Sequence, residues 1–245
     1  MQKHKSLFND TSYSQVTVGD VQHCLRLNDL NEIGDQTHYL DFWMLGLFSF
    51  QDWSLKQGIE FWFYFLNQLG IPPDTVTIPP HRPEWGDLYS HLPVEVKEDP
   101  DCIWSDGVIG GDCTEFYRQG VEIGNIVYTL NRSLDCGFGL ERLEMFYQNH
   151  PVQTLKREDI LYRTVQLLLE QGIQPSSKQQ GYVLRKLIRE LWKKQQPLPQ
   201  HLYIEQEKKR LEKIQKDKPL ILRKHPGKEP SFYWETFGLD EEDLN

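Results

Sequence analysis

The strongest pattern of apolar and polar positions lies over residues 54–69 and is helical. Apolar side chains recur there every three or four residues, as in a helix that turns one face to a core. They are Leu55, Ile59, Phe61, Trp62, Phe65 and Leu69. Gly70 and the Ile71-Pro72-Pro73 run end the pattern, because proline cannot continue a helix. The sequence predicts a helix packed on a sheet, with its aromatic rings in the core.

Other local patterns predict strands, a short helix and a loop. The segments 75–78 and 122–129 favour strands, since their apolar and β-branched residues alternate or run together. A helix is expected over 140–147, entered from a turn at Gly137, Phe138 and Gly139. Residues 216–230 contain three prolines and a glycine, and they are expected to form a loop.

Beyond about residue 150 the apolar spacing is helical throughout. The positions are Ile160, Val165, Leu168, Val183, Leu184, Leu187, Ile188 and Leu191. Because strands occur before this point, the change near His150 and Pro151 predicts two domains. Residues 1–150 are expected to form an α+β core, and residues 151–245 a helical region.

Composition indicates a soluble, folded, intracellular protein. With 245 residues, 38% of them hydrophobic, the chain is long enough to bury a core. No cysteine pair has C-x-x-C spacing, so neither a zinc site nor a disulfide framework is expected. Apolar runs of membrane-spanning length and the apolar stretch of a signal peptide are missing from the sequence. We expect a cytoplasmic protein with no membrane partner.

Charge is distributed unevenly along the chain. The net charge is −9, but residues 178–228 hold 15 Lys and Arg against 5 Asp and Glu, which is +10 and leaves −19 elsewhere. Such a basic segment suits contact with a nucleic acid backbone. The alternative is a solvated helix face, because its lysines and arginines alternate with glutamates. Both interpretations stay open from the sequence.

The most informative motif is Leu-Asp-Cys-Gly-Phe-Gly-Leu-Glu-Arg at 134–142, with Gly-Asn-Ile-Val-Tyr at 124–128 behind Glu122. A strand with an acid, glycines that admit a ligand close to the backbone, and an early helical arginine suit a nucleotide site closed by a cation. Together the two segments resemble motif 3 and its preceding strand in the catalytic core of alanyl-tRNA synthetase, a class II aminoacyl-tRNA synthetase.

The resemblance continues on both sides of this motif. Segments 24–26, 28–34, 44–46 and 48–50 are similar to the motif 2 hairpin of the family. Trp104 and the Cys-Thr-Glu-Phe run at 113–116 match a tryptophan and a Cys-Thr-Glu turn. Segments 172–176 and 181–189 look like the helical tRNA-recognition region, and residues 232–238 are close to the family's Leu-Tyr-Asp-Thr-Tyr-Gly-Phe stretch. The resemblance implies an antiparallel class II sheet flanked by helices, followed by a helical C-terminal region.

Several family features are missing. After Arg26 the family has an Ala-Gly-Gly-Lys turn whose lysine binds phosphate, and here Leu27 leads directly to Asn28. Trp43 stands where motif 2 has a glutamate. The family's first helix would precede residue 1, and editing and C-terminal domains have no counterpart. These departures indicate a trimmed, free-standing relative, for which full tRNA charging is not assumed.

The resemblance assigns two arginines to catalysis. Arg26 matches the arginine that binds the α-phosphate and the substrate carboxylate, a bidentate task that suits a guanidinium. Arg142 matches the arginine on the adenine and near the γ-phosphate. Asn125 and Gly139 complete the implied ATP site. The alternatives are a surface arginine at Arg26, and at Arg142 an ion pair with a neighbouring glutamate of its helix.

The implied amino-acid site centres on Asp135. Its carboxylate matches the family's acid for the substrate α-ammonium, which would give orientation and discrimination. Trp104 and Gly137 would line the same pocket, although a lone tryptophan is more often a core residue and a glycine can simply mark a turn. Cys136 replaces a threonine of the family. The sequence leaves its effect on the pocket open.

The tRNA side carries a weaker pattern. Ser177 stands where the family has an asparagine that reads the acceptor stem. Phosphate contacts carry no sequence information and would survive this change. The candidate RNA-binding residues are Arg185, Lys186, Arg189 and Lys193.

Two function classes follow. The first is a ligase that activates a small, alanine-like amino acid with ATP and Mg²⁺ and passes it to tRNA or another acceptor. The second is a non-catalytic paralogue that binds nucleotide, amino acid, RNA or a protein partner. The intact motif 3 favours the first class, and the motif 2 losses favour the second. Fold alone does not decide between them.

Overall fold

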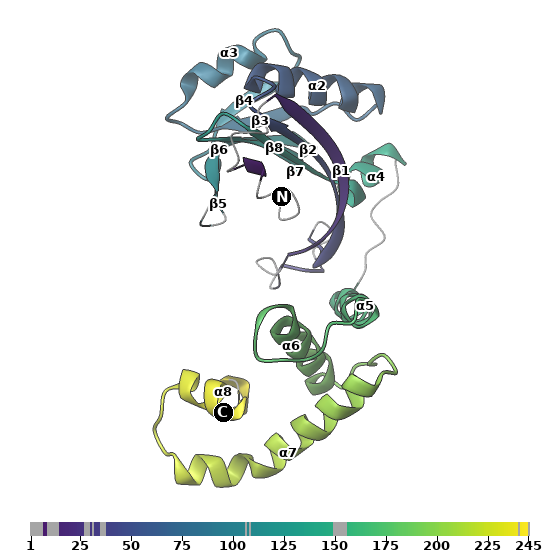
Figure 1. Ribbon diagram of the computed structural model, residues 1–245, viewed down its shortest axis with the longest axis vertical. Coiled ribbons are helices and arrows are strands. Elements are labelled where there is room, and N and C mark those ends of the chain that lie inside the picture. The colour runs from purple at the N-terminus through teal and green to yellow at the C-terminus, as the bar shows by residue number, and fades with distance from the viewer. Residues whose placement is uncertain are drawn as a thin grey trace. The chain divides into compact units, whose positions relative to one another are not determined.

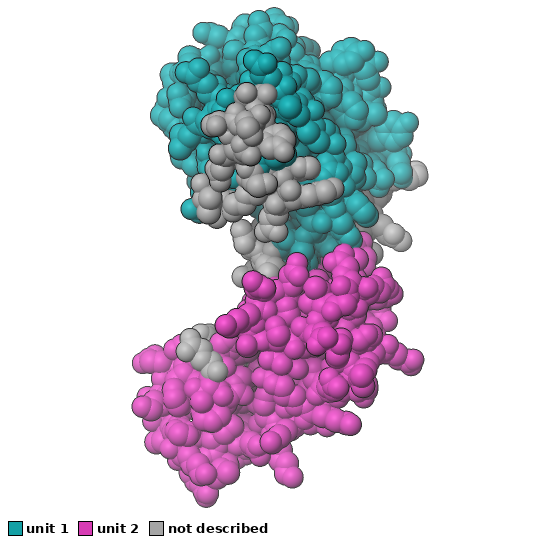
Figure 2. Space-filling model, in the orientation of Figure 1, with its two compact units in different colours: residues 1–154 teal, residues 155–245 magenta. Residues whose placement is uncertain are grey.

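The computed structural model describes residues 7–8, 15–26, 30, 32–34, 38–105, 107, 109–148, 156–239 and 241–244. The chain divides into two compact units, Met1–Thr154 and Leu155–Asn245, which Figure 2 shows in different colours. The predicted junction near His150 and Pro151 lies outside the described residues.

Unit 1 is built on a largely antiparallel sheet, as the sequence predicts for the α+β core (Figure 1). Among the described residues the sheet has eight strands in the order β1-β2-β8-β7-β6-β3-β4, with β5 paired to β6. Only the β3–β4 pair of these strands is parallel. The bounds are β1 Val16–Leu25, β2 Asp41–Phe50, β3 Thr75–Ile78, β4 Glu95–Glu98, β5 Ile103–Ser105, β6 Gly110–Arg118, β7 Val121–Thr129 and β8 Leu134–Gly139.

Helices cover one face of this sheet. The elements are α2 Leu55–Gln68, the 3-10 turn η3 Pro83–Trp85, α3 Gly86–Tyr89 and α4 Leu140–Tyr147. A capping box fixes the start of α2, since Ser54 and Gln57 satisfy each other's backbone N–H groups. Both α2 and α3 lie on the same side of the sheet in Figure 1. The predicted helix over 54–69 is therefore confirmed, and it packs on the sheet as expected.

The core of unit 1 fills the space between α2 and the sheet. Trp62 of α2 stacks on Phe138 of β8 with ring centroids 3.9 Å apart, and both side chains are buried. On the α3 side, the Tyr89 hydroxyl lies 2.6 Å from the Thr114 hydroxyl, so this buried pair satisfies its own polar groups. Of the helix aromatics expected in the core, Trp62 is buried and Phe65 is partly buried, whereas Phe61 is 38% exposed.

Strand β8 has two different faces. Leu134, Cys136 and Phe138 are buried in the core under α2, whereas alternate residues point to the opposite face of the sheet. Asp135 and Gly137 belong to that opposite face. The Cys136 thiol therefore lies in the helix-covered core, and its replacement of threonine does not shape the face that carries Asp135.

One sequence expectation for this region is wrong. Gly137, Phe138 and Gly139 form the end of strand β8 rather than a turn, because Gly137 pairs with Gly46 of β2 and Asn125 of β7. The following helix begins at Leu140, as predicted. The two glycines thus belong to sheet pairing.

Unit 2 is helical, and its elements are α5 Arg157–Glu170, α6 Gln179–Lys193, α7 Leu202–Lys224, α8 Pro230–Phe237 and α9 Glu241–Leu244. The loop expected over 216–230 is wrong in its first part, because α7 runs through Pro219 to Lys224. A proline inside a helix removes one backbone hydrogen bond and costs stability, but neighbouring contacts can override that cost. Pro230 opens α8, where a missing N–H has no consequence. No helix within the described residues is both long and apolar enough to cross a membrane.

Candidate nucleotide site

A pocket in unit 1 gathers side chains from three separate parts of the chain. Its polar and glycine lining includes Arg26, Glu122, Asn125, Gly137, Gly139 and Arg142. Further lining comes from Tyr39, Phe42, Met44 and Glu141. Five residues that the sequence analysis assigns to ATP or amino-acid binding are thereby brought to one place.

Arg142 is positioned by the strand beside it. Its Nη1 donates to the backbone oxygen of Glu122 at 2.7 Å and to the Glu122 carboxylate at 3.1 Å. The two side chains are 20% and 29% exposed, so the guanidinium is half-buried but reachable from the pocket. The structural alternative for Arg142 was an ion pair with a glutamate of its own helix. An ion pair is present, but its acid is Glu122 on β7. The guanidinium is preorganised at the pocket wall rather than packed along its own helix.

A second carboxylate closes the pocket on the other side. Both oxygens of Glu141 accept the backbone N–H of Trp43, at 3.0 and 3.1 Å. The Trp43 ring stacks on His23 with centroids 4.6 Å apart and stays 44% exposed. Although Trp43 replaces the glutamate of motif 2, a carboxylate from α4 therefore lies next to that position.

Arg26 follows the last residue of β1 and is exposed. Its backbone N–H donates to Leu40 O at 2.8 Å, which continues the pairing of β1 and β2 by one residue. The hairpin predicted from the motif 2 resemblance is thus present as two antiparallel strands. The shortened junction between Leu27 and Asn28 lies outside the described residues.

Three glycines line the pocket, and they differ in how much room a side chain would have there. A methyl group on Gly137 would lie 3.0 Å from the Met44 sulfur, and one on Gly124 would lie 2.2 Å from the Phe138 ring. A methyl group on Gly139 would meet only Arg142, at 3.7 Å or beyond. Close packing therefore requires glycine at Gly124 and favours it at Gly137, whereas Gly139 has room for a side chain.

Asp135 and Trp104 lie farther along the same face of the sheet and outside the residues that line the pocket. Asp135 is two residues before Gly137 on β8, and its cross-strand neighbour on β7 is Val127. Trp104 of β5 packs against Val127 and the two cysteines Cys102 and Cys113. Two of the three residues predicted to bind the amino acid thus flank Val127, whereas the third, Gly137, lines the pocket with the arginines.

Two cysteines and a glutamate meet next to Trp104, which the sequence analysis did not anticipate. The Sγ atoms of Cys102 and Cys113 and a Glu115 carboxylate oxygen all lie within 4.8 Å of one another. A hydrogen bond with Cys102, together with burial, raises the pKa of the Cys113 thiol. Burial also raises the pKa of the Glu115 carboxyl, although a hydrogen bond from Tyr117 opposes this shift. Cys102 and Cys113 are far apart in sequence, so only strand pairing reveals the cluster.

In unit 2 a second pocket lies between α6, α7 and α8. Its lining includes Ser177, Tyr182, Arg185, Arg210, Lys213 and Trp234. Arg185 also contacts the buried Glu207 carboxylate at 3.0 Å, and Arg210 contacts it at 2.6 Å. This pocket is cationic and partly aromatic, but its arginines are already paired with acids of the same unit.

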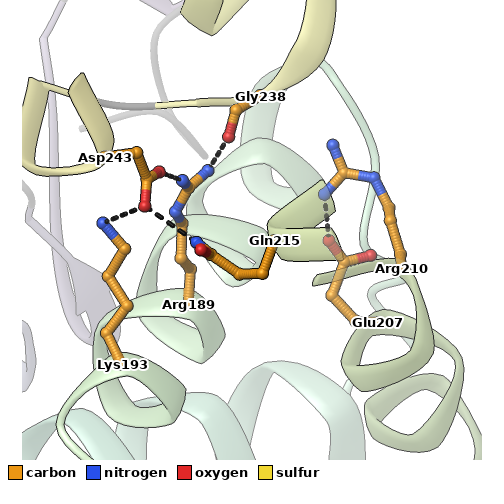
Figure 3. A network of polar contacts seen from close by, with 7 residues as sticks. All are labelled: Arg189, Lys193, Glu207, Arg210, Gln215, Gly238 and Asp243. Atoms are coloured by element: carbon orange, nitrogen blue, oxygen red, sulfur yellow. Dashed lines mark hydrogen bonds and ion pairs between the residues drawn. The ribbon is translucent and has the colours of Figure 1, made fainter. Parts of the chain in front are cut away.

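The four candidate RNA-binding residues have different surroundings. Figure 3 shows the Arg189 guanidinium on the Asp243 carboxylate and the Gly238 carbonyl oxygen. Lys193 lies 3.3 Å from the same carboxylate. Lys186 is exposed on α6 and Arg185 is half-buried. Arg189 and Lys193 therefore take part in a network that attaches α9 to α6, whereas Lys186 faces solvent.

Comparison with known proteins finds similarity to tRNA synthetases. Residues 1–98 match the family model of the class II (A) tRNA synthetases. The chain is 28% identical over 241 residues to an alanine–tRNA ligase of Tropheryma whipplei, covering 70% of this chain and 27% of the relative. The chain resembles the catalytic core of alanine–tRNA ligases.

Two further alanine–tRNA ligases give similar values. The one from Francisella philomiragia is 31% identical over 242 residues, covering 69% of this chain and 28% of the relative. The one from Synechococcus is 27% identical over 254 residues, covering 74% of this chain and 28% of the relative. The chain thus spans less than a third of the length of these relatives. This synthetase-like similarity and the α+β fold agree with the family that the motifs at 134–142 and 24–50 predict.

Some residues of the site escaped the sequence analysis. Glu122 was noticed only as a neighbour of the motif, yet it is the acid that holds Arg142. Phe42 and Met44 belong to β2, which pairs with β8, and Tyr39 precedes that strand, so the local sequence does not reveal that they line the pocket. The alternation along β8 was the one available signal, because it places Asp135, Gly137 and Gly139 on one face.

Proposed function

We propose that the chain is an alanyl-type ligase that activates a small amino acid with ATP. In this reaction a carboxylate oxygen of the amino acid forms a bond to the α-phosphorus. The bond to the bridging oxygen breaks, and pyrophosphate leaves. An acceptor hydroxyl, amine or thiol, on tRNA or another molecule, then takes the aminoacyl group and releases AMP. Positioning and charge stabilisation suffice for such a step, and no covalent residue is needed.

The observation that carries the proposal is the convergence of Arg26, Asn125, Gly137, Gly139 and Arg142 on one pocket. These residues come from distant segments, and each had been assigned to nucleotide or substrate from its sequence match alone. Arg142 is held in place by Glu122 before any ligand binds, so it loses little freedom on contact with an adenine or a phosphate. Arg26 is exposed at the same pocket, and its guanidinium is of the type that suits a bidentate contact with a phosphate or carboxylate.

The charges at the pocket fit a nucleotide that arrives with Mg²⁺. Two guanidiniums are offset by the carboxylates of Glu122 and Glu141, so the protein alone provides little net positive charge for a triphosphate. Magnesium prefers oxygen ligands, and Glu122 and Glu141 are the residues that would hold it. When bound, the ion neutralises charge on the phosphate oxygens of the leaving pyrophosphate.

The amino-acid end is proposed at Asp135. This residue shares a strand face with Gly137 and Gly139 but lies farther from the arginines, as an acid for the α-ammonium would. An ionised, half-buried carboxylate orients the substrate through its α-ammonium group and disfavours analogues that lack the amine. Trp104 lies across Val127 from it and would close the side-chain end of a small pocket.

Unit 2 is proposed to contact an RNA acceptor through its backbone phosphates. Lys186 is exposed, and Arg185 and Lys213 line the cationic pocket between α6 and α7. Arg189 and Lys193 contribute by fixing the helices that present these cations. Tyr182 and Trp234 of the same pocket offer rings on which an unpaired base would stack.

A binding protein without catalysis is the second candidate. One observation favours it. The pocket that is lined by two arginines is also lined by two glutamates, and Arg142 already pairs with one of them, Glu122. A ligand must compete for that guanidinium, which weakens the phosphate contact that catalysis needs. Such a paralogue would bind nucleotide or amino acid but turn over neither.

Amino-acid-dependent exchange of pyrophosphate into ATP separates the two candidates. The purified chain is assayed with each small amino acid in the presence of Mg²⁺, and exchange is expected with at least one of them. Asp135→Asn removes the charge for the α-ammonium but keeps the shape, so exchange should collapse while ATP binding persists. Binding of ATP without exchange for any amino acid would leave only the second candidate.

A further inference from the structure

The cluster of Cys102, Cys113 and Glu115 lies outside the residues that line the nucleotide pocket. Cys113 and Glu115 are alternate residues of β6 and therefore project from the same face of the sheet. Cys102 is brought to them by the start of β5, where the Cys113 N–H donates to Cys102 O at 2.9 Å. The cluster is thus built on paired strands rather than on a loop, and its side chains are presented together.

The separations match those of a bound metal. In a tetrahedral zinc site, bond lengths of about 2.3 Å to sulfur and about 2.1 Å to oxygen put neighbouring ligand atoms roughly 3.6–3.8 Å apart. In this structure the three atoms lie within 4.8 Å of one another. Metal binding would bring these atoms closer together through rotation of the three side chains. Both thiols are buried, at 0% and 2% exposure, so water does not compete for them.

Neighbouring hydroxyls orient two of the three side chains, Cys102 and Glu115. The Cys102 thiol donates to the Thr77 hydroxyl at 3.1 Å, and that hydroxyl donates to Glu115 at 3.3 Å. The Tyr117 hydroxyl donates to the same Glu115 oxygen at 2.7 Å. One carboxylate oxygen is thereby fixed by hydrogen bonds. Metal ligands are commonly held by such outer contacts, which fix their direction and tune the metal.

We infer that Cys102, Cys113 and Glu115 bind one zinc-type divalent cation through two thiolates and a carboxylate, with water in the fourth position. Two thiolates select a soft or borderline cation over Mg²⁺ or Ca²⁺. Binding releases both thiol protons to solvent and converts a buried pair of thiols into metal ligands. The sequence expectation of no zinc site relied on C-x-x-C spacing, which strand pairing makes unnecessary. The inference stands whether or not the chain activates an amino acid.

Cobalt tests the site in the whole chain. The protein is produced in cobalt-supplemented minimal medium and purified under reducing conditions without a chelator. We expect about one cobalt per chain, a thiolate-to-cobalt charge-transfer band in the near ultraviolet, and visible bands of tetrahedral cobalt. Zinc prefers the same ligands as cobalt but has a filled d shell and no visible bands. Zinc that replaces the cobalt should therefore bleach these bands.

Single variants locate the ligands. Cys102→Ser and Cys113→Ser should each remove most of the charge-transfer band and weaken metal affinity by at least about 100-fold, more than the loss of an outer contact. Cys136→Ser removes an equally buried thiol on the opposite face and serves as the matched control, with bands and metal content unchanged. Circular dichroism of each variant confirms that it folds.

Three results would overturn the inference. The wild-type chain could contain less than a tenth of an equivalent of metal and show no cobalt bands. The bands could persist in Cys102→Ser and Cys113→Ser. Peptide mapping of the chain purified under reducing conditions could find a disulfide between Cys102 and Cys113, which would leave no thiolates for a metal. The first and third results need no variant, so they remain decisive even where a substitution prevents folding.

Discussion

The arginines of the two units do different jobs, although the sequence presents them alike. In unit 1, Arg142 contacts Glu122 at the edge of a pocket, and the two side chains are 20% and 29% exposed. In unit 2, Arg189 pairs with Asp243, and the two side chains are only 6% and 5% exposed. A ring of Trp234 also lies 5.3 Å from the Arg189 guanidinium. Burial and partners, not charge alone, decide whether an arginine is available to a ligand.

The two units also differ in what fixes their geometry. The pocket of unit 1 rests on strands whose close approach depends on glycines, such as Gly124 against Phe138. The cationic pocket of unit 2 is held by side-chain ion pairs. Asp243 contacts both Arg189 and Lys193 (Figure 3), and Glu207 contacts both Arg185 and Arg210. An added methyl group should therefore lower the stability of unit 1, and a removed charge should lower the stability of unit 2.

The largest expected effect is the loss of the Asp243 charge. Asp243→Asn removes the counter-ion that the buried Arg189 shares with the partly buried Lys193, so the free energy of unfolding should fall by about 3 kcal/mol. Urea unfolding of the whole chain, followed by circular dichroism, measures it. Glu205→Gln, which removes an exposed partner of Lys208, is the control and should change stability by less than about 0.5 kcal/mol. Equal effects in the two variants would show that Arg189 is not a structural charge.

A smaller loss is expected from crowding the sheet of unit 1. In Gly124→Ala the new methyl group would lie 2.2 Å from the Phe138 ring, so the ring or the strand must shift. The cost should be about 1–3 kcal/mol of unfolding free energy, as for other overpacked cores. Gly139→Ala has only an ordinary 3.7 Å contact with Arg142 and a φ of −69°, so its stability should hardly change. A neutral Gly124→Ala would mean that β7 and β8 are less closely packed than described.

The smallest expected effect concerns pH. Burial alone would raise the pKa of Glu190, but hydrogen bonds from Arg157 and Lys194 outweigh it and lower the pKa below 4.5. A carboxyl with a lowered folded pKa stabilises the fold above its unfolded pKa and loses that contribution as pH falls through the folded value. Glu190→Gln should therefore cost at most about 1 kcal/mol near pH 7 and nothing in strong acid.

The partner variant checks the origin of this pH dependence. Arg157 contacts Glu190 with two nitrogens, at 2.8 and 3.2 Å. If that contact lowers the pKa of Glu190, then Glu190→Gln should reduce the free energy of unfolding by less in an Arg157→Gln chain than in the wild type. The dependence of that reduction on pH should also be smaller. An unchanged pH profile in the double variant would assign the effect to another group.

Local patterns predicted the parts of the fold that local physics determines. The strand at 75–78 and the helix at 140–147 match the structure residue for residue, because β-branched runs and helical spacing act over short distances. Gly137 and Gly139 were expected in a turn, yet pairing with β2 and β7 extends them. Pro219 was expected in a loop, yet α7 continues through it. In both cases tertiary contacts overrode a local preference.

The site shows the same division. Motif matching selected Arg26 and Arg142, and the structure brings them to one pocket. Motif matching could not identify the acids that pair with the arginines, because the acid that contacts Arg142 is 20 residues away in sequence and the acid that contacts Arg189 is 54 residues away. Cys102 and Cys113 were separated by too many residues to suggest a site. Pairings between distant segments need a fold before they can be recognised.

The central claim is that the pocket around Arg142 binds ATP, and calorimetric titration with ATP and Mg²⁺ tests it most directly. The wild-type chain should bind, and Arg142→Ala should bind about 30-fold more weakly, a loss of about 2 kcal/mol typical of a half-buried guanidinium contact. Arg223→Ala, which removes an exposed charge in unit 2, should bind as the wild type does. No binding to the wild type, or equal affinity in folded Arg142→Ala, would contradict the account.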